Sequence, residues 1–174
     1  MEAIPAAGIP AEAVLIGPAI LIGTGATAFL DLCAAIQHRL FGTVKPNYAL
    51  VGRWLAHLPR GRFFHDAIAH SAPTRGERAI GWVAHYAIGI GFAAILLAIW
   101  GSEWTRNPAL LPALIVGIGS VAAPFLLMQP GMGLGIAANH TANPNAARLR
   151  SLATHTIFGI GLYAAGSAAR LIDL

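Results

Sequence analysis

The chain has 174 residues, of which 56% are hydrophobic and only 10% are charged. Soluble domains carry about a quarter charged residues, so this composition excludes an ordinary water-soluble surface and favours an outer wall that faces lipid. The formal net charge of +4 arises from residues concentrated in two connecting segments, a pattern that indicates membrane orientation rather than binding to nucleic acid.

Four apolar stretches are each long enough to cross the hydrocarbon core of a bilayer. A helix rises ~1.5 Å per residue, so ~20 residues cover ~30 Å. A single crossing segment must satisfy its own backbone hydrogen bonds, which excludes strands. The stretches cover residues 13–36, 79–99, 109–128 and 151–169. They predict an all-α fold, a four-helix transmembrane bundle that forms one integral membrane domain over residues 1–174.

The first stretch contains a carboxylate, Asp31, within an apolar helix. An aspartate at the centre of a span costs roughly 2.5–3.5 kcal/mol on insertion scales, so it should face the protein interior and have a partner. A seven-residue spacing relates Gly17, Thr24, Asp31 and His38. This spacing predicts one stripe of small and polar residues that is suited to helix contacts.

The segment between the first two stretches, residues 40–78, is too long for a simple turn. Within it, residues 47–58 predict a short amphipathic helix, because apolar side chains recur there at helical spacing. We expect this helix to lie along the inner membrane surface. Asn47 and Arg53 belong to it and are candidate contacts for a ligand.

The basic residues predict which side of the membrane each loop occupies. The loops after the first and third stretches hold nine of them: Arg39, Lys45, Arg53, Arg60, Arg62, Arg75, Arg78, Arg148 and Arg150. The opposite side holds two, Arg106 and Arg170. Cytoplasmic loops are enriched in lysine and arginine, so we expect both basic loops in the cytoplasm and both termini outside.

The third stretch ends irregularly. Pro124 is expected to kink it, and residues 125–135 stay apolar but contain many prolines and glycines, which form poor regular helix. Irregular backbone at membrane depth is tolerated where protein or a cavity covers it, and broken helices often mark binding sites in transporters. A plain helix end in a loop is the alternative. Gln129 is the candidate ligand contact in this segment.

The second and fourth stretches repeat one pattern, in which a histidine is followed after three residues by Gly-Ile-Gly. The two histidines are His85 and His155. Residues 23–26 and 117–120 give a weaker match between the first and third stretches. The repeat predicts two helix hairpins related by a pseudo-two-fold axis along the membrane normal, with both histidines at one depth and facing the bundle centre.

Asp31, His85 and His155 are therefore predicted to form one polar layer inside the membrane. A hydrogen-bonded cluster that only holds the helices together would explain this layer, and so would a binding site or path for a small ligand. Two histidines at equal depth would also suit the axial positions of a haem, with neighbouring glycines making room for the macrocycle. A simple metal site would have only three protein ligands here.

The sequence contains no motif that indicates an enzyme. It lacks Gly-x-Ser-x-Gly, paired carboxylates and the Gly-Lys-Ser/Thr of a phosphate loop. The leading hypothesis is a non-enzymatic membrane protein that binds or passes a small ligand through the Asp/His layer. The alternatives are a bis-histidine, cytochrome-like electron carrier and a structural or assembly subunit, whose small residues would pack against partner proteins or further copies of the chain.

Four short strings resemble a known family. They are residues 47–54 (NYALVGRW), 81–86 (GWVAHY), 128–135 (MQPGMGLG) and 151–155 (SLATH). Together they resemble the domain of unknown function 2938 family of small bacterial inner-membrane proteins, and the resemblance extends from Gly23 to Tyr163. It implies a multipass protein in a bacterial inner membrane. The family name carries no activity, so the resemblance implies no catalytic residue.

Overall fold

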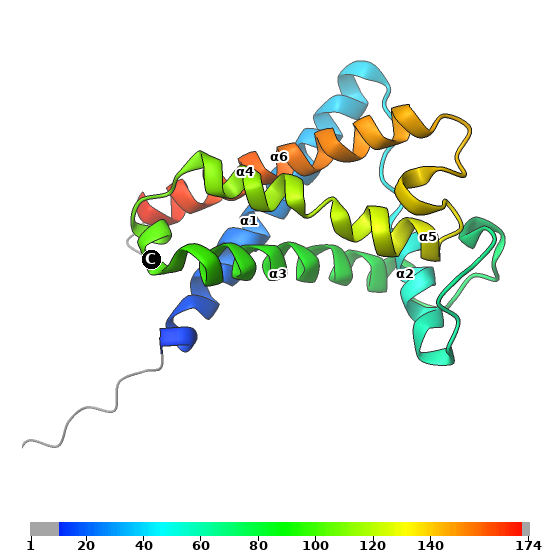
Figure 1. The fold of residues 1–174 in the computed structure, drawn as a ribbon, viewed down its shortest axis with the longest axis horizontal. Helices are drawn as coiled ribbons and strands as arrows, with labels where there is room; N and C mark the ends of the chain where they lie inside the picture. The colour runs from blue at the N-terminus through cyan, green and yellow to red at the C-terminus, as the bar shows by residue number, and fades with distance from the viewer. Residues whose placement is uncertain (1–10, 172–174) are drawn as a thin grey trace, which may run out of the picture.

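The computed structural model describes residues 11–171, which form helices and turns with no strand among them. The all-α prediction is confirmed for this part of the chain. Three long helices, α1 (Ala11–Phe41), α3 (Glu77–Arg106) and α6 (Pro144–Leu171), lie side by side in it with the shorter α4 (Leu110–Gly119) (Figure 1). Helix α1 packs against α3 and α6, and α4 packs against α6 and α3.

Three helices are long and apolar enough to cross a membrane: Leu15–Phe41, Glu77–Arg106 and Leu110–Gly131. They overlap the first three predicted stretches. The fourth stretch, residues 151–169, is helical as part of α6, but α6 is not one of these three helices. Its sequence Thr154-His155-Thr156 lowers the hydropathy of the segment, and the fourth crossing stays a prediction.

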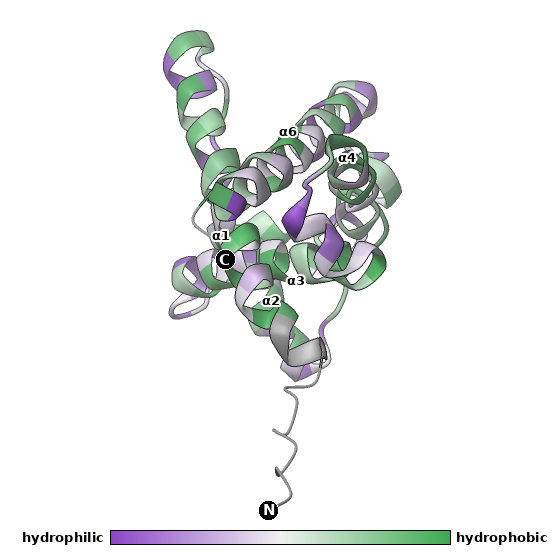
Figure 2. Ribbon diagram, turned by 90° about the vertical axis from the view of Figure 1, so that its left-hand side faces the viewer, coloured by the Kyte–Doolittle hydropathy of each residue, from purple (hydrophilic) through white to green (hydrophobic). Residues whose placement is uncertain are grey.

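Large apolar side chains cover the outside of the three candidate spans. Val83 on α3 is 70% exposed and Leu111 on α4 is 69% exposed. Figure 2 shows hydrophobic residues along much of α3 and α4. Soluble proteins rarely expose large contiguous apolar surfaces, whereas lipid covers them without cost. These helices therefore indicate a membrane protein.

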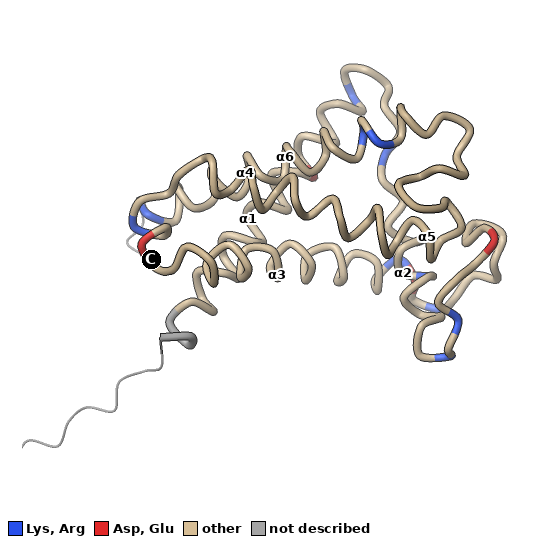
Figure 3. The backbone as a smooth tube through the Cα atoms, in the orientation of Figure 1, with Lys and Arg blue, Asp and Glu red and all other residues tan. Residues whose placement is uncertain are grey.

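Lysine and arginine residues lie at the two ends of the helical body (Figure 3), most of them at the end that carries α2 and α5. The α3–α4 connection lies at the other end, together with the C-terminal part of α6 (Figure 1). This separation agrees with the two basic loops lying on one side. Which side faces the cytoplasm stays a prediction.

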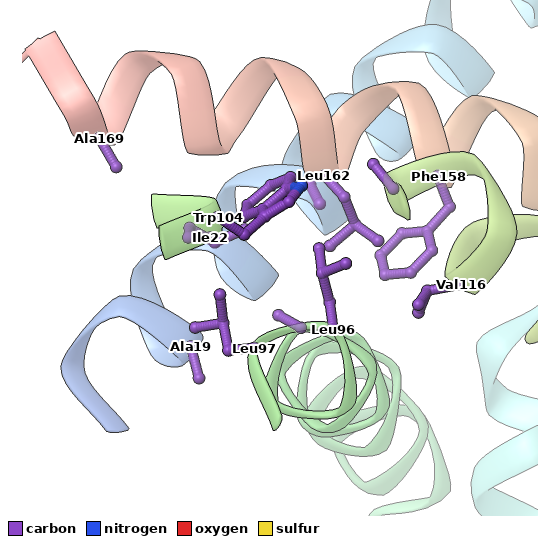
Figure 4. Packing of buried hydrophobic residues seen from close by; sticks show 12 residues of the cluster. Ala19, Ile22, Leu96, Leu97, Trp104, Val116, Phe158, Leu162 and Ala169 are labelled. Atoms are coloured by element: carbon purple, nitrogen blue, oxygen red, sulfur yellow. The ribbon is translucent and has the colours of Figure 1, made fainter. Parts of the chain in front are cut away.

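The apolar core packs side chains from α1, α3, α4 and α6 against one another (Figure 4). Ile22, Leu96 and Leu162 are fully buried there. Helix α3 breaks at Gly101, whose φ of 70° is readily adopted only by glycine. The turn beyond the break brings Trp104 onto the core, where its Nε1–H donates to the carbonyl of Ala109 at 3.1 Å.

The predicted amphipathic helix is confirmed as α2 (Tyr48–His57). The loop that follows it contains two short 3₁₀ turns, η1 (Leu58–Arg60) and η2 (Ile68–His70), before α3 begins. Asn47 is the N-cap of α2, and its side-chain oxygen accepts the Ala49 N–H at 3.2 Å. This cap satisfies one of the free backbone donors at the start of the helix.

The predicted irregularity of the third span is also confirmed. Helix α4 ends at Gly119, and it is followed by the π-helical η3 (Pro124–Met128), the single turn α5 (Gln129–Gly131) and the 3₁₀ turn η4 (Ile136–Ala138). Pro124 has no N–H to donate to the Ser120 carbonyl, which accepts the N–H of Ala123 at 3.1 Å instead. The missing donor therefore explains the change of helix type at this point.

Two helix pairs are in close contact at matching glycines. A Cβ at Gly23 of α1 would collide with the α3 backbone beside Gly89, and a Cβ at Gly117 of α4 would collide with the α6 backbone at Gly159. These are residues of the sequence repeat, and each repeat histidine lies four positions before the glycine on its helix. The two helix pairs thus share a glycine contact at corresponding positions of the repeat, whereas the two hairpins and their pseudo-two-fold axis stay a prediction.

Candidate ligand-binding site

Three helices converge on the Asp31 carboxylate. Its Oδ1 accepts hydrogen bonds from the Tyr48 hydroxyl at 3.2 Å and from His85 Nε2 at 3.0 Å. Its Oδ2 accepts the Tyr86 hydroxyl at 3.1 Å. The carboxylate of α1 is therefore held by one side chain from α2 and two from α3. These contacts supply the partner that an intramembrane aspartate requires.

Helix α2 reaches Asp31 because a pair of glycines lets it lie directly on α3. A Cβ at Gly52 would collide with the carbonyl oxygen of Glu77, and a Cβ at Gly81 would collide with that of Tyr48. The close approach stacks the Tyr48 ring on the His85 ring, with centroids 4.1 Å apart and planes 26° apart. Larger residues at either glycine would lift Tyr48 away from the carboxylate.

The environment of Tyr48 keeps its hydroxyl protonated. Burial raises the pKa of Tyr48, and the negative charge of Asp31 beside it raises that pKa further. The edge of the Trp82 ring covers the Tyr48 ring at a centroid distance of 4.7 Å. Tyr48 is therefore a hydrogen-bond donor to Asp31 at physiological pH.

Arg53, a candidate ligand contact from the sequence, forms contacts within the protein. Its Nε and Nη2 donate to the two carboxylate oxygens of Glu77 at 2.8 and 2.9 Å. Its Nη1 donates to backbone carbonyls of the loop between α2 and α3, those of Ile68, Ala69 and Ser71. A guanidinium occupied in this way fixes the loop against the start of α3.

Two other candidates lie away from the carboxylate. Asn47 is exposed and caps α2, as described above. Gln129 is 7% exposed, with its Nε2 3.4 Å from Ser151 Oγ and its Oε1 without a partner among the described residues. The structure thus brings Asp31 and His85 into contact but places Asn47, Arg53 and Gln129 elsewhere.

A cavity of about 370 Å³ lies between α1, α2, α3, α6 and the broken segment after α4. Most of its wall is apolar, and no residue lining it is a lysine, arginine, aspartate or glutamate. The lining residues are Thr27, Leu30, Pro46, Tyr48, Val51, Trp54, Leu55, His85, Ile88, Gly89, Phe92, Ser120, Ala123, Pro124, Leu127, Met128, Thr154, His155 and Phe158. Small-molecule pockets have volumes of roughly 300–1,000 Å³ and similar walls. Both repeat histidines line this one cavity.

His155 is held by Ser120, at a distance of 2.6 Å between Nδ1 and the serine Oγ. The helix break provides this serine contact. After the break begins, the Val121 N–H donates to the carbonyl of Ile118, so the Gly117 carbonyl accepts the Ser120 hydroxyl at 2.5 Å instead. The irregular backbone therefore sets the polar partner of His155.

The structure also bears on the haem and metal hypotheses. His85 Nε2 is in contact with Asp31, so this nitrogen is not free to bind iron. Within residues 11–171, no group of three or more His, Cys, Asp or Glu side chains has a geometry that could hold a metal ion. Each repeat histidine is held by a partner within the protein, His85 by Asp31 and His155 by Ser120.

Sequence reasoning did not select three residues of this site, Tyr48, Tyr86 and Ser120. Tyr48 belongs to the apolar face of α2, and its hydroxyl gives no signal in a hydrophobic pattern. Tyr86 follows His85 directly, and Ser120 ends the weaker repeat match at residues 117–120. The two tyrosines could have been selected from the sequence because an aspartate inside the membrane requires hydrogen-bond donors nearby.

The fold and the cavity define a helical membrane protein with a mostly apolar cavity that two histidines line. Residues 20–169 match the family described as "Protein of unknown function (DUF2938)". The chain belongs to this family, as the four strings predicted. No curated protein and no solved structure matches the chain.

Proposed function

We propose that this protein binds a small, largely apolar molecule in the cavity that His85 and His155 share. The cavity carries the proposal, because an apolar pocket with a few converging polar groups is the usual form of a small-molecule site. The Asp31 cluster has a supporting role: it fixes α2 and His85 at one wall. The broken segment after α4, including Ala123 and Pro124, forms another wall of the cavity.

We further propose that α6 is a fourth crossing in a bacterial inner membrane, with the basic loops in the cytoplasm and the termini in the periplasm. Helix α6 packs along α1 and α4, both of which belong to candidate spans. The matching contacts of Gly23 and Gly117 support an arrangement of two related hairpins. Reporter fusions at the C-terminus and in the 132–143 loop test the topology.

Photo-crosslinking tests ligand binding. The probe is a medium-chain aliphatic alcohol that carries a diazirine in its chain, added to the purified protein in lipid nanodiscs. We expect saturable labelling of cavity residues, identified by peptide mass spectrometry, and competition by unlabelled decanol. Ala123→Phe fills the cavity without removing a polar group, and we expect it to abolish the saturable labelling.

Ala122→Phe is the matched control, because Ala122 is exposed, does not line the cavity and precedes Ala123 in sequence. We expect this variant to be labelled like the wild type. The proposal would be contradicted if labelling did not saturate, spread evenly over the lipid-facing helices and was unchanged in Ala123→Phe. The cavity would then bind no such molecule.

A further inference from the structure

We propose that the ligand carries a neutral hydrogen-bond donor, a hydroxyl, on its apolar body, and that Nε2 of His155 accepts this bond. The proposal rests on the proposed function, because it names the chemistry of a molecule in the same cavity. It follows from the directions of the hydrogen bonds around the cavity wall.

The hydroxyl groups that line the cavity already donate their protons to the protein. Thr27 donates to the carbonyl of Gly23 at 2.8 Å, and Thr154 donates to that of Arg150 at 2.9 Å. Tyr48 donates to Asp31, as described above. A hydroxyl has a single proton, so each of these groups offers only oxygen lone pairs to a ligand.

The nitrogen donors of the wall are occupied in the same way. Trp54 Nε1–H donates to the carbonyl of Phe63 at 3.0 Å. His85 Nε2 donates its N–H to Oδ1 of the Asp31 carboxylate at a distance of 3.0 Å. Neither side chain has this N–H left for a molecule in the cavity.

Ser120 fixes the tautomer of His155. Its Oγ is 2.5 Å from the Gly117 carbonyl oxygen, and two oxygens at this distance need a proton between them. The serine has only that one proton, so it accepts from His155, whose Nδ1 must carry the hydrogen. In the neutral ring Nε2 is then a bare lone pair, and among residues 11–171 no side chain or backbone group donates to it.

The cavity wall therefore offers a ligand hydrogen-bond acceptors but few free hydrogen-bond donors, and the apolar surroundings have a low dielectric constant. A ligand group that only accepts hydrogen bonds would face lone pairs, and leaving a buried polar group unpaired costs about 1–3 kcal/mol. An anionic head group would meet no cation, because no lysine or arginine lines the cavity. A neutral alcohol meets these constraints.

Two isomers test the donor requirement: decanol and methyl nonyl ether have the same atoms, but only the alcohol donates a hydrogen bond. Each competes with the diazirine probe in nanodiscs. We expect decanol to compete at a roughly tenfold lower concentration than the ether, after correction for their partitioning into lipid. His155→Phe should remove this preference, and His70→Phe, which changes an exposed histidine outside the cavity, should keep it.

Nitrogen-15 NMR of labelled histidine tests the same inference on the unaltered protein. We expect the wild-type His155 ring to carry its proton on Nδ1 and to leave Nε2 unprotonated. Equal competition by the two isomers, or a wild-type ring protonated on Nε2, would overturn the donor requirement. Failure of the probe to label the cavity at all would instead contradict the proposed function.

Discussion

The His85 half and the His155 half of this molecule share a glycine contact between two helices, but their histidines have different polar partners. Each histidine lies one helical turn before a glycine that touches the neighbouring helix of its hairpin. His85 contacts a carboxylate that also receives two tyrosine hydroxyls. His155 contacts a neutral serine.

This difference shows that small residues set where the helices meet, whereas the partner of each histidine sets what it can do. On the first side, Asp31 joins α1, α2 and α3 through direct hydrogen bonds, so His85 belongs to a structural cluster as well as to the cavity wall. On the second side, Ser120 orients His155 without a charge and leaves Nε2 without a protein partner. We expect stability to depend mainly on the first half and ligand selection on the second.

Removal of the carboxylate should have the largest effect on stability. Asp31→Ala leaves three part-buried donors without their acceptor. An unpaired donor costs about 1–3 kcal/mol when it is fully buried, so we expect the free energy of unfolding to fall by about 3 kcal/mol in total. Ser120→Ala removes a single partner of His155 and should cost about 1–2 kcal/mol. Thermal unfolding of the detergent-purified variants, followed by circular dichroism, measures the difference. Equal losses would contradict the assignment of the structural role to the Asp31 half.

Substitutions that force the helices apart should reduce the free energy of unfolding by an intermediate amount, which we expect to be similar in both halves. Gly23→Ala and Gly117→Ala each place a Cβ against the backbone of the neighbouring helix, and overpacking of this kind costs about 1–3 kcal/mol. Gly17→Ala and Gly119→Ala are the controls, because a Cβ at either position meets nothing within 4 Å. The same unfolding assay applies, and a loss at the control positions as large as at the contact positions would refute the shared packing.

Removal of a single tyrosine hydroxyl should have the smallest effect. Tyr48→Phe keeps the ring stacked on His85 but deletes one hydrogen bond to Asp31, so we expect a loss of about 0.5–1.5 kcal/mol. A double-mutant cycle with Asp31→Ala should show coupling, because the hydroxyl has no acceptor to lose once the carboxylate is gone. Additive losses would mean that Tyr48 stabilises the protein through stacking alone.

Much of the fold was predictable because its signals are local in the sequence. The apolar stretches gave three candidate spans, helical spacing gave α2, and Pro124 gave the break after α4. The cost of a carboxylate in lipid predicted that Asp31 has partners, and the histidine repeat selected two residues that line one cavity.

The tertiary structure alone decided which partners those residues have. Tyr48 reaches Asp31 only because Gly52 and Gly81 let α2 lie on α3, and no hydrophobic pattern records that approach. His155 pairs with Ser120 because the helix break leaves the Gly117 carbonyl free to accept the Ser120 hydroxyl. Spacing along the chain determines which face a side chain occupies, but the direction of each hydrogen bond depends on groups that only folding brings within about 3 Å of one another.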